Sequence, residues 1–331
     1  MYSDEDLEKA VTAGIFGVDA VSKFRNYMAD INDRSSIDEE NIRLIASFND
    51  VFVVVACLLV LWSSAWVAHA FHPALSMGVV AFLSWGLAEF FVLQRNMALP
   101  AIFLLLSFVV GVFGSVVLWF DVPSEKTFML SAAVTVLATW WHWQRFKVPL
   151  TVAAGAVAIV IFSVSLINSL FAVGEDWILY QMFLGGVAIF VAAVVWDSAD
   201  LHRVSRQSDI AFWLHLVSAP LIVHPLFASL GVLEGSQGLQ GIFLIVGLYV
   251  FLTVLSLMLD RRAFMLAALA YVLFALSTLL KTYGLVEDSF ALVGVCIGFS
   301  LLLLSGFWHK ARYHLVSILP QTVQSKLPVT H

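Results

Sequence analysis

Long apolar runs, separated by short polar stretches, make up the chain after about residue 48. A bilayer core of about 30 Å needs roughly 20 apolar residues in one helix. A helix satisfies its own backbone hydrogen bonds in lipid, so we expect an all-α bundle of about ten transmembrane helices. The ten runs that predict these helices are 51–70, 73–94, 99–120, 128–144, 149–171, 177–196, 209–230, 239–259, 263–281 and 288–308.

Composition supports this fold class. Hydrophobic residues make up 61% of the 331 residues and charged residues 12%, whereas a soluble domain has about 45–50% apolar and about 25% charged residues. The sequence therefore predicts an integral membrane protein in the lipid bilayer. The chain has only two cysteines, which excludes a disulfide framework, and both lie in apolar runs. No feature indicates a nucleic-acid partner.

The distribution of positive charge predicts the orientation of the runs. If the N-terminus, the even-to-odd connections and the C-terminus share one side, that side holds 15 of the 17 Lys and Arg residues. The other side holds Lys126 and Lys281. Positive residues favour the cytoplasmic side, so we expect both termini in the cytoplasm. The first 20 residues are acidic and polar, unlike a signal peptide, and we expect the first run to act as its own insertion signal.

Residues 1–48 predict a small cytoplasmic head of short amphipathic helices, ahead of a membrane domain over 49–308 and a cytoplasmic tail over 309–331. An apolar stripe at helical spacing carries this interpretation: Leu7, Ala10, Val11 and Ile15. The head is either a helical cap packed on the membrane face or a docking site for a protein partner.

The head also carries a resemblance. The segment Leu7-Glu8-Lys9-Ala10-Val11-Thr12-Ala13-Gly14-Ile15-Phe16, followed by Ala20-Val21 and Phe24, resembles the N-terminal segment of a family of uncharacterised predicted bacterial membrane proteins. In that family a helical pair of this pattern precedes a bundle of membrane helices. The resemblance implies a bacterial inner membrane and brings no catalytic residues.

The two halves of the membrane domain suggest a duplication. Ile102-Phe103-Leu104 leading to Phe128-Met129-Leu130 is echoed by Ile242-Phe243-Leu244 leading to Phe264-Met265-Leu266. An offset of five helices gives the halves opposite topology, which is a common plan of secondary transporters. Apolar sequences also match by chance, so both interpretations stay open. The five-plus-five layout resembles the drug/metabolite transporter superfamily, whose sequence motifs this chain lacks.

Ionisable residues within membrane helices are costly and therefore candidate functional groups. Glu89 lies six residues before Arg95, and His215 lies six residues after Asp209. At about 1.5 Å per residue, both side chains would lie about 9 Å inside the cytoplasmic boundary. A carboxylate and an imidazole at one depth are able to share a proton. The alternative is structural: a protonated or hydrogen-bonded Glu89 and a packed core His215.

The seventh run is the most polar and has two interior prolines. Asp209, His215 and Ser218 are its candidate substrate or proton groups, and Pro220 is its candidate hinge, with Pro225 further on. A proline removes a backbone donor and kinks a helix, and transporters place substrate and ion sites in broken helices. The alternative is an ordinary proline-kinked helix with Asp209 as its N-cap.

The remaining histidines are weak candidates for haem or metal ligands, namely His69, His142 and His224. His215 and His224 are nine residues apart, so they differ by about 180° around the helix and cannot share one centre. The spacings His-x-x-x-His, Cys-x-x-Cys and His-Glu-x-x-His do not occur in the sequence. We therefore expect no metal or cofactor.

Other patterns predict packing and anchoring. Gly111 and Gly155 favour close helix contacts. The tryptophans within 140–143 are typical of an interfacial aromatic belt. The segment 308–313 predicts a basic anchor near anionic lipid headgroups.

These observations favour a secondary-transporter-like carrier of a small or amphipathic solute, with proton coupling as an option. The first alternative is a non-catalytic scaffold or regulatory partner that acts through the head. A membrane-embedded haem or metal protein or enzyme is the second. The substrate and the oligomeric state stay open.

Overall fold

The computed structural model describes residues 11–13, 15, 17, 19–21, 23–24, 48–120, 122–171, 174–200, 205–232, 239–282, 289–324 and 327. Contacts divide the chain into one unit over Met1–Ile42, with His331, and a second over Arg43–Thr330. Each unit is described by itself. In the first, residues 11–12 and 19–21 are helical and Val21 is buried. Most of the predicted head over 1–48 lies outside the described residues.

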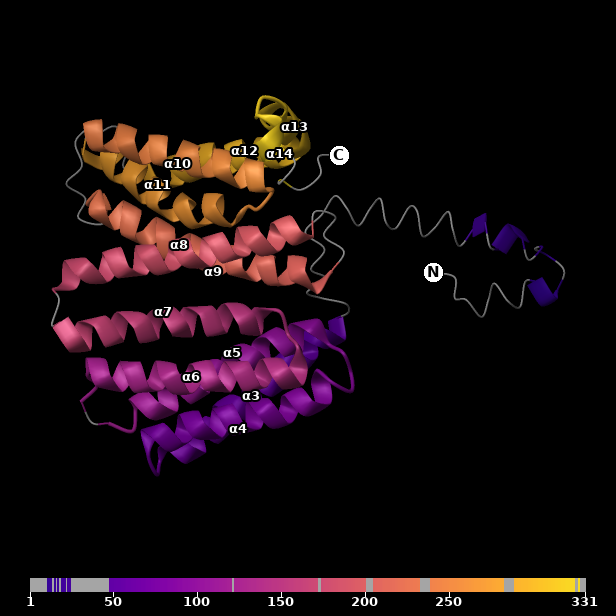
Figure 1. Cartoon of the computed structure of the whole chain (residues 1–331), viewed down its shortest axis with the longest axis vertical. Helices are drawn as coiled ribbons and strands as arrows, with labels where there is room; N and C mark the ends of the chain where they lie inside the picture. The colour runs from indigo at the N-terminus through magenta and orange to yellow at the C-terminus, as the bar shows by residue number, and fades with distance from the viewer. Residues whose placement is uncertain are drawn as a thin grey trace. The chain divides into compact units, whose positions relative to one another are not determined.

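Within its described ranges the second unit consists of helices joined by turns, and its first ten helices coincide with the ten apolar runs. Figure 1 labels them along the chain. They are α3 (Phe48–His69), α4 (Pro73–Phe91), α5 (Ala98–Val117), α6 (Glu125–Phe146), α7 (Leu150–Phe171), α8 (Glu175–Ala199), α9 (Arg206–Ser229), α10 (Leu239–Leu259), α11 (Ala263–Thr282) and α12 (Ser289–Gly306). Two short helices follow, α13 (Trp308–Ser317) and α14 (Gln321–Gln324).

Six of these helices are long and apolar enough to cross a membrane when only the described residues are considered: α3, α4, α5, α7, α8 and α9. The count rises to seven if α12 and α13, which meet at a bend of 70°, form one span. The structure thus supports a multi-pass, all-α membrane protein. Helix α6 is less apolar because charged and strongly polar residues lie in its first and last turns, and hydroxyls also recur on its buried face, at Thr127, Ser131, Thr135 and Thr139.

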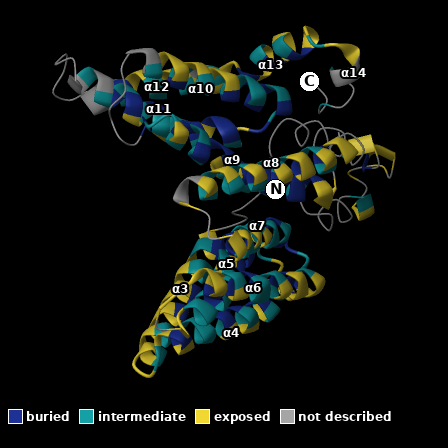
Figure 2. Cartoon of the chain, turned by 60° about the vertical axis from the view of Figure 1, so that its left-hand side comes forward, coloured by how far each residue is buried: buried dark blue, intermediate teal, exposed yellow. Residues whose placement is uncertain are grey.

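Helix α9 is the central helix of the second unit. Of its most apolar window 56% is buried, against 11–33% in the other five candidate spans. It packs on α8, α11 and α7. By contrast, exposed side chains run along α3, as Figure 2 shows in yellow. Polar groups on α9 therefore face protein, while much of α3 is free to face lipid.

The contacts form two groups of five helices. Helices α3 to α7 pack mainly on one another, as do α8 to α12, and the groups meet where α7 contacts α8 and α9. Within the groups the packing differs, because α4 packs mainly on α3 and α5 whereas α9 packs mainly on α8 and α11. The internal repeat stays a prediction.

The predicted close helix contact at Gly111 is present between α5 and α4. A Cβ atom on Gly111 would lie 2.7 Å from the backbone nitrogen of Ala81 and 2.8 Å from the backbone oxygen of Met77. Gly155 of α7 similarly faces Thr139 of α6, whose Oγ1 would be 3.1 Å from an added Cβ. Small residues at these positions let the helix backbones approach closely.

Candidate functional site

A group of buried polar side chains lies where α8 ends and where α9 and α11 begin. Asp197 comes from the last turn of α8, Ser208 and His215 come from α9, and Arg261 lies two residues before the start of α11. We call these four residues the buried ionic cluster. All four are buried, with between 0% and 6% of each residue exposed to solvent. Burial of charge at this depth requires pairing, because an isolated ion in a low-dielectric interior is strongly disfavoured.

Arg261 and Asp197 form the centre of the cluster. The Arg261 guanidinium donates from Nη2 to Asp197 Oδ1 at 2.7 Å and from Nε to Oδ2 at 3.3 Å. Its Nη2 also lies 3.3 Å from Ser208 Oγ. His215 Nε2 lies 3.7 Å from Asp197 Oδ2, which is too far for a hydrogen bond but within ion-pair distance when the imidazole is protonated. The cluster thus joins α8, α9 and the α10–α11 turn.

Local backbone geometry and aromatic rings hold these groups in place. Asp260, with φ of 55°, adopts the left-handed conformation that reverses the chain after α10. The next backbone N–H, that of Arg261, then donates to Ser256 O at 2.9 Å. Phe190 packs edge-on to His215, with ring centroids 5.6 Å apart, and the Arg261 guanidinium lies 5.8 Å from the Phe212 ring. These rings limit the access of water to the charges.

Helix α13 extends this network. Trp308 Nε1 donates to Asp260 Oδ1 at 2.8 Å, and Arg312 Nε lies 3.7 Å from the same oxygen. The negative charges that act on Arg312 are those of Asp260 and Asp197. Trp308 and Arg312, both within the predicted anchor over 308–313, are thus buried. Helix α13 is attached to the α10–α11 turn on the same side as the cluster.

The candidate residues of the seventh run lie in or beside this cluster. Asp209, half-buried in the first turn of α9, lies in the electrostatic field of Arg261. Ser218 is fully buried and donates its hydroxyl to the backbone oxygen of His215 at 3.1 Å. Helix α9 continues through Pro220 to Ser229. The hinge at Pro220 stays a prediction.

Glu89 lies in a separate ion pair. Its carboxylate accepts from Arg145 Nε at 2.9 Å and from Nη2 at 2.7 Å, which joins α4 to α6. The side chains of Arg145 and Glu89 are 52% and 34% exposed, respectively. The carboxylate closest to His215 among the ion pairs is instead that of Asp197. Glu89 and His215, which the sequence places at the same depth, therefore have different partners in the structure, Arg145 and Asp197.

The candidate metal-ligating histidines lie on three different helices, α3, α6 and α9. His142 Nδ1 lies 3.2 Å from Thr151 Oγ1, and His224 Nδ1 lies 2.7 Å from the Tyr271 hydroxyl. His69 is exposed at the end of α3. Within the described ranges, no group of three or more His, Cys, Asp or Glu side chains is arranged to hold a metal ion.

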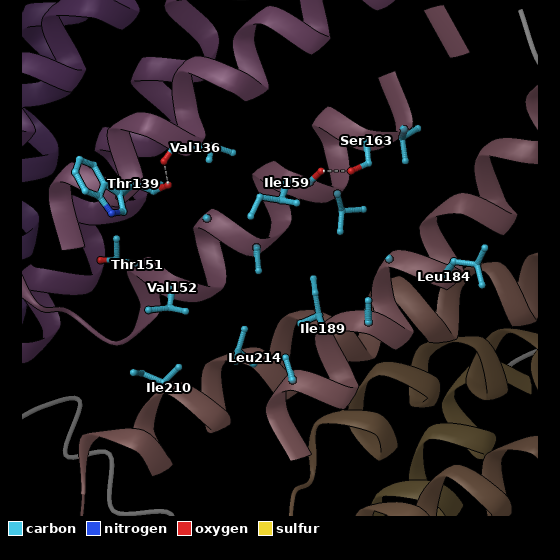
Figure 3. Close-up of a pocket in the computed structure, with 18 of the residues that line it drawn as sticks. Val136, Thr139, Thr151, Val152, Ile159, Ser163, Leu184, Ile189, Ile210 and Leu214 are labelled. Carbon is cyan, nitrogen blue, oxygen red and sulfur yellow. Dashed lines mark hydrogen bonds between the residues drawn. The ribbon is translucent and has the colours of Figure 1, made fainter. Parts of the chain in front are cut away.

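An apolar cavity opens between the two groups of helices. We call it the lateral groove. Its volume is about 830 Å³, and residues of α6, α7, α8 and α9 line it, within the range of about 300–1,000 Å³ typical of ligand pockets. Figure 3 shows lining residues of the groove on both walls, namely Thr151, Ile159 and Ser163 on α7 and Leu184 and Ile189 on α8.

The lateral groove and the buried ionic cluster occupy adjacent positions on two helices. Trp196 lines the groove and Asp197 belongs to the cluster. On α9, Leu214 lines the groove and His215 belongs to the cluster. A displacement of either helix by a bound molecule would therefore move a member of the Asp197–His215 pair.

Two functional candidates, Asp197 and Arg261, did not emerge from the sequence as a pair. Asp197 stands out only as part of a polar connection, and Arg261 only as a positive loop charge. The available signal was an acidic residue at the end of one apolar run and an arginine in a short loop predicted on the same side.

Comparison with protein-family profiles, with functionally described proteins and with solved structures found no match to this chain.

Proposed function

We propose that the protein is a carrier of a small or amphipathic solute in the cytoplasmic membrane, with ten spans and both termini in the cytoplasm. The observation that supports it is the adjacency of the lateral groove to the buried ionic cluster. A groove of this size has room for a solute. The buried imidazole of His215, 3.7 Å from the Asp197 carboxylate, supplies a group that can bind a proton beside the groove.

Coupling between the two sites follows from the packing of α8 and α9. A solute in the groove contacts Trp196 and Leu214, which are covalent neighbours of Asp197 and His215. Protonation of His215 changes its interaction with Asp197 and Arg261, and therefore the fit of α8 against α9. Polar and ionisable groups buried in membrane helices commonly serve as proton relays. In this proposal the cluster, rather than Glu89, carries the proton, with Asp209 and Ser218 next to it.

The distribution of charge supports the proposed topology. The cluster, the Glu89–Arg145 pair and α13 all lie toward the helix ends on the predicted cytoplasmic side, which holds 15 of the 17 Lys and Arg residues. Helices α6, α10, α11 and α12 complete the ten spans.

Cysteine labelling tests this topology. In a C57A/C296S background, we expect Ser124→Cys to react with a membrane-impermeant maleimide in intact cells, because residue 124 is exposed and on the predicted outer side. Gln94→Cys, equally exposed but on the predicted inner side, should react only after the cells are permeabilised. Equal reaction of the two variants in intact cells would contradict ten spans with both termini inside.

Transport is tested with the purified protein in liposomes. A fluorescent NBD-labelled lysophosphatidylglycerol is presented on one side, and its transbilayer movement is followed by dithionite quenching. We expect movement to accelerate under a proton gradient. Replacing His215 by glutamine should abolish this acceleration, because the glutamine side chain does not take up the proton that the proposal assigns to His215.

Glu89→Gln provides the matched comparison, since Glu89 lies in a different and more exposed ion pair. If Glu89→Gln abolishes the acceleration and His215→Gln does not, the cluster is not the proton site. If neither the wild type nor the variants move this anionic probe or a matching zwitterionic lysophosphatidylcholine probe, the carrier proposal fails.

A further inference from the structure

We infer that the lateral groove binds the single acyl chain of an anionic amphiphile, with the headgroup beside Lys147. The inference rests on the proposed function, because it names the chemical class of the solute that the proposed carrier binds. The evidence is the length of the groove, the chemistry of its two ends and its nearly continuous apolar lining.

The length of the groove fits an extended chain better than a compact solute. Lining residues run from Thr151 to Ile167 on α7 and from Gln181 to Trp196 on α8. At 1.5 Å per residue these walls are about 24 Å and about 22 Å long. One leaflet of the hydrocarbon core is about 15 Å deep. An extended chain that fills the groove therefore continues past the middle of the bilayer.

One end of the groove is polar but uncharged. Gln181, which lines the groove, donates from Nε2 to Asn168 Oδ1 at 3.2 Å, and this bond joins α8 to α7. An amide pair that links the two walls limits the groove at this end. Between the ends, the lining consists mostly of Val, Ile, Leu, Ala and Gly, which suits methylene groups.

The other end is aromatic and positive. Trp140 and Trp143 line it, and Lys147 Nζ lies 5.3 Å from the centre of the Trp143 ring. Arg145, two residues earlier, is already paired with Glu89, whereas the contact of the Lys147 ammonium is with the neutral Gln144 side chain, at 3.3 Å. An ammonium group over an indole ring, at the membrane interface, favours an anionic headgroup.

Photolabelling of the detergent-solubilised full-length protein tests this site. The probe is a palmitoyl lysophosphatidylglycerol with a diazirine on its chain, and labelled peptides are identified by mass spectrometry. We expect label on α7 and α8. Ala188 and Ala192 are exposed and line the groove, so A188F/A192F should lower labelling of these helices about tenfold by filling the space. The matched control is Ala56→Phe, at an exposed position of α3, which should label as wild type does.

Two further comparisons identify the ligand. Lys147→Gln should lower labelling severalfold with this probe and leave labelling by the zwitterionic phosphatidylcholine analogue unchanged. Unlabelled palmitoyl lysophosphatidylglycerol should compete with the probe on wild type, and the octanoyl form should not. This competition also tests the site if A188F/A192F does not fold.

Label spread evenly over the exposed helices, including α3, would overturn the inference, as would equal labelling of wild type and A188F/A192F or equal competition by both chain lengths. An effect of Lys147→Gln on both headgroups, or on neither, would overturn the assigned anionic head. Groove labelling without transport would refute the carrier and keep the site. Transport without groove labelling would refute the site and keep the carrier.

Discussion

Replacing Arg261 by methionine should lower the free energy of unfolding by about 3–5 kcal/mol, because it leaves the buried Asp197 carboxylate without its principal partner. Methionine keeps much of the volume of the arginine stem, so the loss measures the charge and its hydrogen bonds. The positive charge of Arg312 also acts toward Asp197, which favours the lower part of this range. The measurement is a titration with sodium dodecyl sulfate in mixed micelles, followed by circular dichroism.

The next residue provides the control. Arg262 is exposed and lies over the Trp308 ring, with 4.9 Å between its guanidinium carbon and the ring centre. Arg262→Met should cost about 0.5–1 kcal/mol, the range of an exposed cation–π contact. The double variant D197N/R261M should be more stable than Arg261→Met alone, because it removes the orphaned charge. Equal losses for Arg261→Met and Arg262→Met would show that the buried pair does not stabilise the fold.

The positions of the helices followed from the sequence because hydrophobic length is a local property. Each of the ten apolar runs coincides with a helix, α3 to α12. The polarity of the seventh run was also informative. This run forms α9, which is the most buried of the candidate spans and contributes His215 and Ser208 to the cluster. A polar sequence in an apolar chain indicates an internal position, because lipid does not solvate such groups.

The partners of the candidate residues could not be predicted in the same way. The rise per residue gives the depth of a side chain, but not the direction it faces or the helix beside it. Glu89 and His215 share a depth, yet Glu89 faces Arg145 of α6 and His215 faces Asp197 of α8. Arg261 reaches the cluster because Asp260 adopts the left-handed conformation, with φ of 55°. Aspartate adopts this conformation only occasionally, so the sequence does not predict it here.

A tight contact between α4 and α5 leads to the second large effect. Gly111→Val should lower the free energy of unfolding by about 3 kcal/mol, because the added Cβ would lie less than 3 Å from backbone atoms of both Met77 and Ala81. Backbone atoms cannot rotate away as a side chain does, so the helices must separate. The separation would also weaken the packing of Ala81 and Phe108, which are buried beside this contact.

The same pair of helices contains a matched glycine. Gly78 of α4 has no atom within 4 Å of an added Cβ, and Gly78→Val should change stability by less than about 0.5 kcal/mol, since valine and glycine differ little in helix propensity. Gly114→Val should fall between the two, because its neighbour is the flexible side chain of Met77. The loss of unfolding free energy should therefore be largest for Gly111→Val, intermediate for Gly114→Val and smallest for Gly78→Val. This order tests whether close backbone contact, rather than glycine content, holds α4 against α5. Equal losses at Gly111 and Gly78 would attribute the effect to the helices themselves and contradict the close approach.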